Sequence, residues 1–326
     1  MRQEVLKYLL AHQGEFVSGQ KISDALGISR TAVWKHIRLL KKRGYVIEAF
    51  TKKGYCLKEA PQLLSVEAIQ KGLKTKCLGQ HLVYLEKTGS TNTVAKKLAA
   101  DGAPEGTVVV AEEQTGGHGR LVRSFLSPFA RGLWFSLILR PDFPPMEVSK
   151  MTLLAAVALC KAMRAQGLTD CGIKWPNDIL VHGKKISGIL TELNASVEKI
   201  NYIIMGIGIN TGLTEKDLTG DLQQTATSFL LEGIQVDRAA LLQGVLKELE
   251  KGYDTAKKKG FAPILKEWKN LSCMLGADVT VTAINRSFTG QAVDLDDDGN
   301  LLVQTKDGLE KVLAGDIHVR PAQQGK

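Results

Sequence analysis

The stretch KWPNDILVHGKKISGIL (Lys174–Leu190) predicts a Trp-Pro-Asn-Asp turn and then a hairpin that delivers Lys185 and Gly188. Downstream, MGIGINT (Met205–Thr211) places alternating glycines in a strand, which is typical of close approach by a ligand or another backbone. Upstream, QTGGHGRLVRS (Gln114–Ser124) combines glycines with the cations Arg120 and Arg123. Each segment alone could be a structural turn, but together they predict a site that handles anions.

The surrounding pattern predicts a mixed α/β domain. EGTVVVAEEQT and LWFSLILRP are typical of strands, VSKMTLLAAVALCKAMRAQG of a long helix, and residues 173–210 of several strands with tight turns. The GGHGR segment lacks a Walker Lys-Ser/Thr, and it leads into another strand-rich segment where a Rossmann loop would open a helix. There is also no GxSxG elbow, so the common nucleotide-binding and hydrolase signatures are excluded.

Composition places the chain among ordinary globular proteins of two or three domains, with 326 residues, 44% hydrophobic and 24% charged. The longest apolar run, Leu153–Cys160, is far shorter than the ~20 residues of a membrane span. The first residues lack the apolar core of a signal peptide, so we expect a cytoplasmic protein without a membrane span. The five cysteines are widely spaced without a zinc pattern, and we expect reduced thiols.

The positive charge is concentrated at one end of the chain. Residues 1–60 hold 12 Lys/Arg and 5 Asp/Glu, a net charge of +7, whereas the remaining 31 and 29 give only +2. Such a basic module on a nearly neutral body indicates contact with a polyanion, although a solvated basic face is the simpler alternative.

Residues 2–60 have the pattern of a winged helix. Apolar residues recur at helical spacing in the first helix, Ser18 and Ser29 are placed as N-caps of two further helices, and Gly27 supplies the left-handed turn between them. Tyr45–Phe50 and Tyr55–Leu57 are predicted strands joined by a basic turn, as in the wing of a winged helix.

This arrangement predicts a helix-turn-helix over Gly19 to Arg38 that enters a DNA major groove. The candidates for contact with bases are Arg30, Thr31 and Lys35, and those for contact with phosphates are Arg38 and the wing residues Lys52 and Lys53. Trp34 is left open between packing in the core of the module and recognition, with packing favoured.

From Gly276 onward the pattern is all-β, with DVTVTA, FTGQAVDLD, NLLVQT and EKVLAG separated by turns. Together with the last residues it fits five short strands in a small barrel. The acidic DLDDDG segment lacks the spaced ligands of an EF-hand and is predicted to be a hairpin turn and not a calcium site.

The ordered set GSTN (Gly89–Asn92), QTGGHGR, KWPNDI, KKISGIL and GIGIN, behind a winged helix, resembles the family of bifunctional biotin–protein ligases and biotin-operon repressors. The resemblance covers essentially the whole chain. It implies an α+β multidomain protein: a winged helix-turn-helix DNA-binding domain (1–60), a mixed α/β, class II synthetase-like biotin- and ATP-binding domain (61–272) and an SH3-like β-barrel (273–326).

The family's activity is thereby implied as well. Its members join biotin to ATP as biotinyl-5′-adenylate and pass biotin to a lysine of a biotin carboxyl carrier protein, the carrier domain of acetyl-CoA carboxylase or of another biotin-dependent carboxylase. With adenylate bound, they dimerise on the operator DNA of the biotin genes. The implied small molecules are biotin, ATP and Mg²⁺, the last held through phosphates.

The resemblance also implies roles for individual residues. Lys185 and Arg120 are expected to act on the reacting anions, and Asp178 to hold Mg²⁺ or to orient the attacking amine. The implied biotin-binding residues are Ser90, Thr91, Asn92, Gln114, Gly117, His118, Gly119, Arg120, Lys185, Gly188, Leu190 and Gly206. The implied ATP- or adenylate-binding residues are Arg120, Arg123, Phe125, Lys174, Asn177, Asn210, Asp316 and Arg320.

The chain departs from the family pattern at two positions of the glycine-rich loop. The usual GRGR core appears as Gly117-His118-Gly119-Arg120, and Phe125 stands where tryptophan is usual. His118 is tolerable if that position acts through its backbone; if its charge matters, substrate binding becomes weaker or pH-dependent. Phe125 can still stack on adenine over a smaller area. A ligand-sensing repressor without ligase turnover and a lipoate–protein ligase are the alternative functions.

Overall fold

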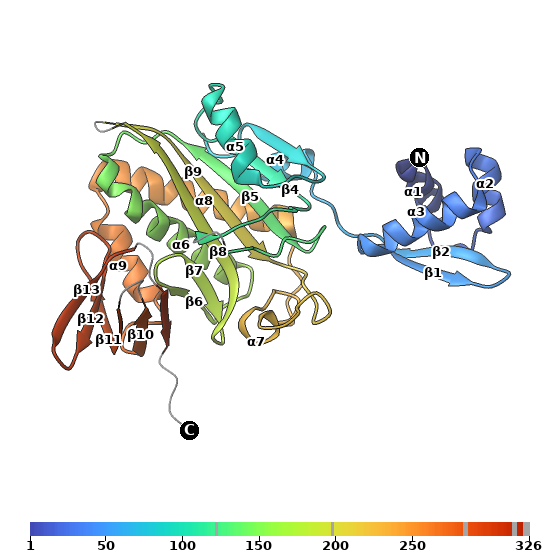
Figure 1. The fold of residues 1–326 in the computed structure, drawn as a ribbon. Coiled ribbons are helices and arrows are strands. Elements are labelled where there is room, and N and C mark those ends of the chain that lie inside the picture. The colour runs from blue at the N-terminus through green and yellow to red at the C-terminus, as the bar shows by residue number, and fades with distance from the viewer. Residues whose placement is uncertain (121–122, 197–198, 283–285, 315–317, 322–326) are drawn as a thin grey trace. The chain divides into compact units, whose positions relative to one another are not determined.

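We describe residues 1–120, 123–196, 199–282, 286–314 and 318–321 of the chain from a computed structural model. The chain folds as two units, Met1–Leu63 and Leu64–Lys326 (Figure 1). The second unit contains both the predicted α/β domain and the C-terminal strands, which share one hydrophobic core.

The first unit consists of α1 (Arg2–Ala11), α2 (Gly19–Leu26), α3 (Arg30–Lys42) and a hairpin of β1 (Val46–Phe50) and β2 (Gly54–Glu59). The predicted caps are confirmed: Ser18 Oγ accepts from the N–H of Lys21, and Ser29 Oγ accepts from the N–H of Ala32, both at 3.1 Å. Gly27 ends α2 at a φ of 63°, a conformation that glycine adopts without steric cost.

The core of this unit is formed by one stripe of α3 together with α1, α2 and the hairpin. Val33, Ile37 and Leu40 are buried as predicted, against residues such as Val5 and Ile22. The opposite face of α3 is therefore left to solvent.

The centre of the second unit is a seven-stranded sheet. Its strands are β3 (Leu82–Leu85), β4 (Val108–Ala111), β5 (Gly132–Leu139), β6 (Cys171–Lys174), β7 (Asp178–Val181), β8 (Lys184–Ala195) and β9 (Ile200–Asn210). They lie in the order β3-β4-β5-β9-β8-β7-β6, and every pairing except the parallel β3–β4 is antiparallel.

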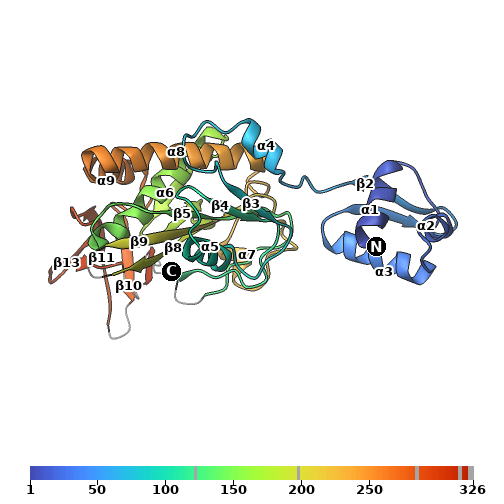
Figure 2. The same cartoon turned by 90° about the horizontal axis from the view of Figure 1, so that it is seen from above.

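Helices cover both faces of this sheet (Figure 2). On one face lie α6 (Val148–Ala165), α8 (Arg238–Lys259) and α9 (Ala262–Leu271), which bury the large core of the unit. On the other lies α5 (Thr91–Ala100), where Ala95 and Ala99 pack on Ile138 and Ile204. Of the shorter elements, α4 (Val66–Lys71) precedes β3 in sequence, the 3-10 turn η2 (Pro145–Glu147) precedes α6, and α7 (Leu222–Thr225) precedes α8.

The C-terminal strands form an antiparallel sheet in the order β13-β12-β11-β10-β14. They are β10 (Asp278–Thr282), β11 (Ser287–Leu295), β12 (Leu301–Thr305), β13 (Gly308–Val312) and β14 (His318–Pro321). The acidic segment is a hairpin turn, as predicted: Asp296 Oδ1 accepts from the backbone N–H groups of Asp298 and Asn300.

Two further expectations concern the whole chain. Among the described residues no helix is long and apolar enough to cross a bilayer. All five cysteines are free thiols, as predicted.

A buried ion pair connects β4 to the start of α8. Glu112 is fully buried, and its Oε2 lies 2.8 Å from Arg238 Nη1. The other oxygen accepts from the N–H of Leu64 at 2.6 Å and from the hydroxyl of Tyr84 at 3.4 Å. Burial, followed by the negative charge of Glu112, raises the pKa of Tyr84 to about 12, so this hydroxyl stays protonated and can donate.

We predict that Glu112→Gln lowers the free energy of unfolding by about 3–5 kcal/mol, because it leaves the buried charge of Arg238 without its carboxylate. Urea unfolding of the full chain measures this loss. The matched control is Glu267→Gln, which breaks a half-exposed pair with Lys161 and should cost at most about 1 kcal/mol. Equal losses in the two variants would contradict the role given to the buried pair.

Candidate active site and DNA-binding face

Three glycines leave a strip of bare backbone on one face of the sheet. In the register, Gly188 of β8 lies opposite Gly208 of β9, and Gly206 lies opposite Leu190. On the other side of β9, Gly206 and Gly208 lie opposite Ser136 and Trp134 of β5. Because directly paired residues point to the same face of a sheet, these positions form one surface.

Side chains lie so close to this glycine strip that a Cβ atom would collide with them. A Cβ on Gly206 would lie 2.1 Å from Asn92 Oδ1, and one on Gly208 would lie 2.5 Å from the ring of Phe125. A Cβ on Gly188 would lie 2.9 Å from Lys185 Nζ. The glycines therefore allow side chains to lie directly on the backbone, whereas the sequence predicted close approach by a ligand or another backbone.

Lys185 places a cation near the start of β8, beside Gly188 of the strip. Lys185 Nζ is 2.6 Å from Asp178 Oδ1 and 5.7 Å from the ring centroid of Phe125. The hairpin of β7 and β8 brings this pair together, and the backbone carbonyl of Lys185 accepts from the N–H of Thr227 at 2.9 Å. The Lys185 side chain is about one third exposed and can meet an anion from solvent.

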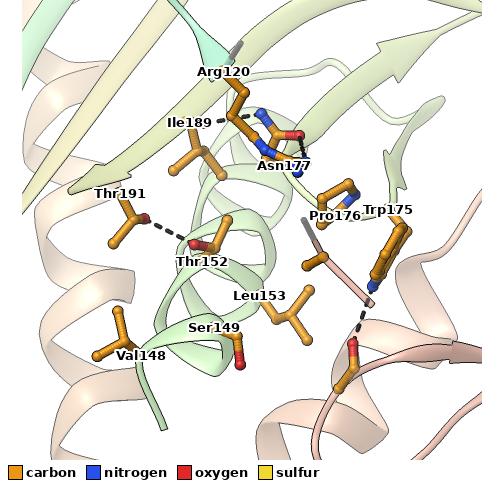
Figure 3. Close-up of a pocket in the computed structure, with 12 residues that line it drawn as sticks. Arg120, Val148, Ser149, Thr152, Leu153, Trp175, Pro176, Asn177, Ile189 and Thr191 are labelled. Carbon is orange, nitrogen blue, oxygen red and sulfur yellow. Dashed lines mark hydrogen bonds between the residues drawn. The ribbon is translucent and has the colours of Figure 1, made fainter. Parts of the chain in front are cut away.

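The glycine-rich loop supplies a second cation. Arg120 Nη1 donates to Asn177 Oδ1 at 3.3 Å, and Asn177 Nδ2 donates to the carbonyl of Ile189 at 2.9 Å (Figure 3). These residues edge a pocket whose other walls include Trp175 and Thr152. The amide of Asn177 thus connects the loop to β8, and the guanidinium remains beside the pocket.

The loop itself is held by backbone hydrogen bonds. Phe125 N–H donates to the carbonyl of Gly117 at 2.8 Å, and Gly119 N–H donates to that of Arg123 at 2.7 Å. One ring nitrogen, His118 Nδ1, lies 3.1 Å from the carbonyl oxygen of Gly116, so this ring turns toward its own loop.

Polar side chains meet at the other end of the glycine strip. Gln114 Oε1 accepts from the backbone N–H of Thr91 at 2.8 Å and from its hydroxyl at 3.0 Å. Asn92 and Thr91 are both nearly fully buried. Three of the predicted biotin-side residues, Thr91, Asn92 and Gln114, are therefore brought together although they lie in two separate segments.

The exposed face of α3 carries the predicted DNA-binding residues. Arg30, Thr31, Lys35 and Arg38 are all exposed. Trp34 is 46% exposed, and the Arg38 guanidinium lies 4.8 Å from its ring centroid. The favoured interpretation of Trp34 as a packed core residue is therefore wrong: the helix turns it out of the core stripe. In the wing, Lys52 and Lys53 are exposed.

Known proteins resemble the chain over nearly its full length. It is 44% identical to the bifunctional ligase/repressor BirA of Bacillus spizizenii over 98% of each chain. It is 29% identical to the bifunctional ligase/repressor BirA of Escherichia coli, covering 97% of this chain and 96% of that one. The chain belongs to the bifunctional ligase/repressor family.

Three segments of this family member match known domain families, in the order that the sequence predicted. Residues 2–56 match an HTH domain, residues 84–210 the biotin/lipoate A/B protein ligase family, and residues 274–320 the biotin protein ligase C terminal domain. Biotin protein ligase from Aquifex aeolicus, solved in complex with biotin and ATP, is similar with a TM-score of 0.65 and 29% identity. That match covers 74% of this chain and 100% of the other. The predicted fold class is confirmed.

The other predicted site residues of this ligase/repressor that the structure describes lie on α5, β6, β8, β9, β14 and the glycine-rich loop. Ser90 is the N-cap of α5, the half-buried Leu190 lies opposite Gly206 in the β8–β9 register, and Lys174 lies opposite Asp178 in the β6–β7 register. Asn210 Nδ2 donates to the carbonyl of Thr227 at 2.9 Å. Arg123 is exposed on the loop, Arg320 belongs to β14, and Asp316 falls outside the described residues.

Sequence reasoning missed two polar residues of the site. Ser136 Oγ lies 2.5 Å from Asn92 Oδ1, and Glu192 Oε2 accepts from Asn92 Nδ2 at 2.7 Å. The signal for Ser136 was present, because it is a lone hydroxyl in the buried strand GLWFSLIL. No local pattern marked Glu192.

Proposed function

We propose that this chain is an ATP-dependent biotin–protein ligase that also represses the biotin operon when biotinyl-5′-adenylate is bound. Its acceptor is a lysine of a biotin carboxyl carrier protein domain, from acetyl-CoA carboxylase or another biotin-dependent carboxylase. The observation that carries the proposal is the glycine strip with Lys185 at its border and with Phe125 and Arg120 supplied by the glycine-rich loop, in a chain that matches ligase/repressors over nearly its whole length.

The cations fit the first half-reaction. Joining a carboxylate to the α-phosphate of ATP brings two anions together, and charge builds up where the phosphorus becomes pentacoordinate. We assign Lys185 to bridge the biotin carboxylate and the α-phosphate, because an ammonium is a compact point charge. Its present partner, Asp178, lies 2.6 Å away and keeps the ammonium at the border of the strip. We assign Arg120 to the same phosphate from the loop.

The glycine strip and its polar end fit biotin. A neutral ureido ring needs a few directed hydrogen bonds within apolar walls. We assign Ser90, Thr91, Asn92, Gln114 and the backbone from Gly117 to Gly119 to the ring. Gly188, Leu190 and Gly206 would then line the ring and the tail, with the carboxylate end of biotin toward Lys185.

The nucleotide would lie at the loop end of the site. We assign Phe125 to stack on adenine, Asn177 and Asn210 to the nucleoside, and Arg123, Lys174, Asp316 and Arg320 to the phosphates. Mg²⁺ would enter with the ATP phosphates, with Asp178 as one carboxylate ligand. This fits the chemistry of the donor set: the described residues contain no group of three His, Cys, Asp or Glu that could hold a metal ion, and Mg²⁺ is commonly bound by one carboxylate together with substrate phosphates and water.

The second half-reaction needs no nucleophile from this chain. The carrier lysine attacks the mixed anhydride, its amine nitrogen forms the amide bond, and AMP leaves with the electron pair of the broken C–O bond. We assign Asp178 to orient that amine when it is not engaged with the metal.

We propose that residues 1–60 bind the operator as one half of a homodimer, with 61–272 as the catalytic domain and 273–326 as the C-terminal domain. Support comes from the exposed cations of α3 and the basic wing. A two-fold operator site requires two such modules at fixed spacing. A cytoplasmic location stays a prediction.

The test is to incubate the full chain with biotin, ATP, Mg²⁺ and an apo carrier domain. We expect ATP-dependent labelling of one carrier lysine, with lipoate competing poorly. If no condition of buffer or metal gives labelling while biotin still promotes operator binding, the chain is a repressor without turnover. If lipoate is transferred in preference to biotin, it is a lipoate–protein ligase.

We predict that Lys185→Met lowers the rate of adenylate formation by about 10²–10³-fold, the usual cost of removing one preorganised transition-state contact. Pyrophosphate release at saturating biotin and ATP measures this rate. Lys184→Met is the matched control on the neighbouring residue of β8, and it should retain most of the activity. A similar loss in both variants would contradict the role of Lys185.

We predict that Arg120→Gly releases reactive adenylate, because it removes the contact with Asn177 and loosens the loop. Bystander lysines in an added neutral protein would then be biotinylated, as measured by mass spectrometry. Arg120→Lys, which keeps a charge on the loop, should release less. Labelling confined to the carrier in Arg120→Gly would show that Arg120 does not retain the adenylate.

For DNA, we predict that Arg30→Ala weakens specific binding by about 1–3 kcal/mol and relaxes the choice of sequence, whereas Lys53→Ala weakens binding to all sequences. Losing one phosphate contact should also reduce the slope of log K against log salt by about 1. Fluorescence anisotropy at several salt concentrations, on operator and random duplexes, measures both. Indistinguishable effects of the two variants would contradict the assignment of α3 to bases and the wing to phosphates.

A further inference from the structure

A series of hydrogen-bonded polar side chains, buried at Ser136, Thr91 and Asn92 and half-buried at Glu192, runs beneath the biotin end of the proposed site. Ser136 is fully buried in β5, and its Oγ lies 2.5 Å from Asn92 Oδ1 and 2.7 Å from Thr91 Oγ1. Glu192, on β8, accepts from Asn92 Nδ2 at 2.7 Å through one oxygen and pairs with Lys96 Nζ at 2.6 Å through the other. Ser136 and Glu192 therefore hold Asn92 from two different strands.

These contacts fix the orientation of the Asn92 amide. A carboxylate accepts hydrogen bonds and cannot donate them, so the NH₂ group of Asn92 must face Glu192. The amide oxygen must then face Ser136, and it lies against Gly206, where a Cβ would be 2.1 Å away. Without Glu192 the amide could turn over and present a donor where it now presents an acceptor.

The hydrogens in this cluster are too few for its contacts. Ser136 and Thr91 have one hydroxyl hydrogen each, yet three oxygen–oxygen contacts must share them: Ser136 to Asn92, Ser136 to Thr91 and Thr91 to Gln114. Because Gln114 Oε1 also accepts from the backbone N–H of Thr91, both amide oxygens are satisfied when Thr91 donates to Ser136 and Ser136 donates to Asn92. Within the cluster Thr91 Oγ1 then accepts no hydrogen, and it is the oxygen that can accept from a donor elsewhere. The N–H groups of a ureido ring are donors of this kind.

The same chain of hydrogen bonds continues to the glycine-rich loop. Gln114 Nε2 donates to Ser127 Oγ at 3.1 Å, and Ser127 Oγ donates to the carbonyl of Phe125 at 3.1 Å. Because Gln114 accepts from Thr91 through its oxygen, its amide is oriented as well. The amide orientations of Asn92 and Gln114 are therefore compatible with every hydrogen bond in the series from Glu192 to Phe125.

We propose that Ser136 and Glu192 are positioning residues for the ureido ring of biotin, acting through Thr91 and Asn92. They present an acceptor-rich cluster to the ring N–H groups without touching the reacting carboxylate or the nucleotide. This inference rests on the proposed ligase function and adds to it the residues that select for a ring with N–H donors.

The test is calorimetric titration of biotin into the full chain without ATP. Ser136→Ala should raise the Kd of biotin by about 10–100-fold, since it leaves buried oxygens unpaired. Glu192→Gln keeps the shape of the side chain and should raise the Kd by about 3–10-fold, since it removes the fixed orientation of Asn92, a charge-assisted bond and the ion pair with Lys96. Desthiobiotin, which keeps the ureido ring, should lose affinity by the same factors.

Steady-state kinetics separates positioning from a general structural defect. In both variants the KM for biotin should rise while the KM for ATP and kcat at saturating biotin stay within about threefold of the wild-type values, because only ureido contacts are lost. Thr107→Val is the matched control: it removes another buried hydroxyl, which donates to the carbonyl of Pro104 at 2.8 Å, and should leave the Kd of biotin unchanged.

The inference is overturned if both variants bind biotin within twofold of the wild-type chain, or if Thr107→Val weakens biotin as much as they do. It is also overturned if the KM for ATP rises in parallel with that for biotin. If the wild-type chain does not bind biotin at all, the proposed function itself fails, and this result is distinguishable from the others because no variant is needed to see it.

Discussion

The close packing of Asn92, Phe125 and Lys185 on bare backbone is the constraint on which the rest of the site depends. These three side chains come from α5, the glycine-rich loop and β8, and each lies where a Cβ on Gly206, Gly208 or Gly188 would collide with it. The register of β5, β9 and β8 then fixes which residues face the strip and which face the large core under α6. The long, regular strands therefore determine the geometry of the chemistry.

The floor and the cover of the site differ in how they are held. The floor belongs to a continuous antiparallel ladder, whereas the cover is the glycine-rich loop, which is held by turn and side-chain hydrogen bonds such as Gln114 to Ser127 and Arg120 to Asn177. A rigid floor suits the orientation of two reactants. Lys185 thus belongs to a strand of the floor and Arg120 to the loop.

Local signals in the sequence predicted much of this and missed the rest for a physical reason. Ser18, Gly27 and Ser29 act within a few residues of their positions, so the caps of the first unit could be predicted. The alternating glycines could be predicted as a place of close approach. By contrast, Ser136 and Glu192 reach Asn92 only because α5 packs on the sheet where β5 and β8 flank β9, and no short-range pattern encodes that packing. Trp34 was misjudged because an aromatic residue beside an apolar stripe has the same pattern whether it packs or projects.

Biotin-dependent exchange of labelled pyrophosphate into ATP, measured on the full chain without any carrier protein, tests the central claim most directly. Reversible adenylate formation on the glycine strip requires that exchange occur, and that it depend on biotin. The account predicts exchange that saturates with biotin and is absent without it. Exchange that proceeds equally without biotin, or none with biotin, ATP and Mg²⁺ all present, would contradict it.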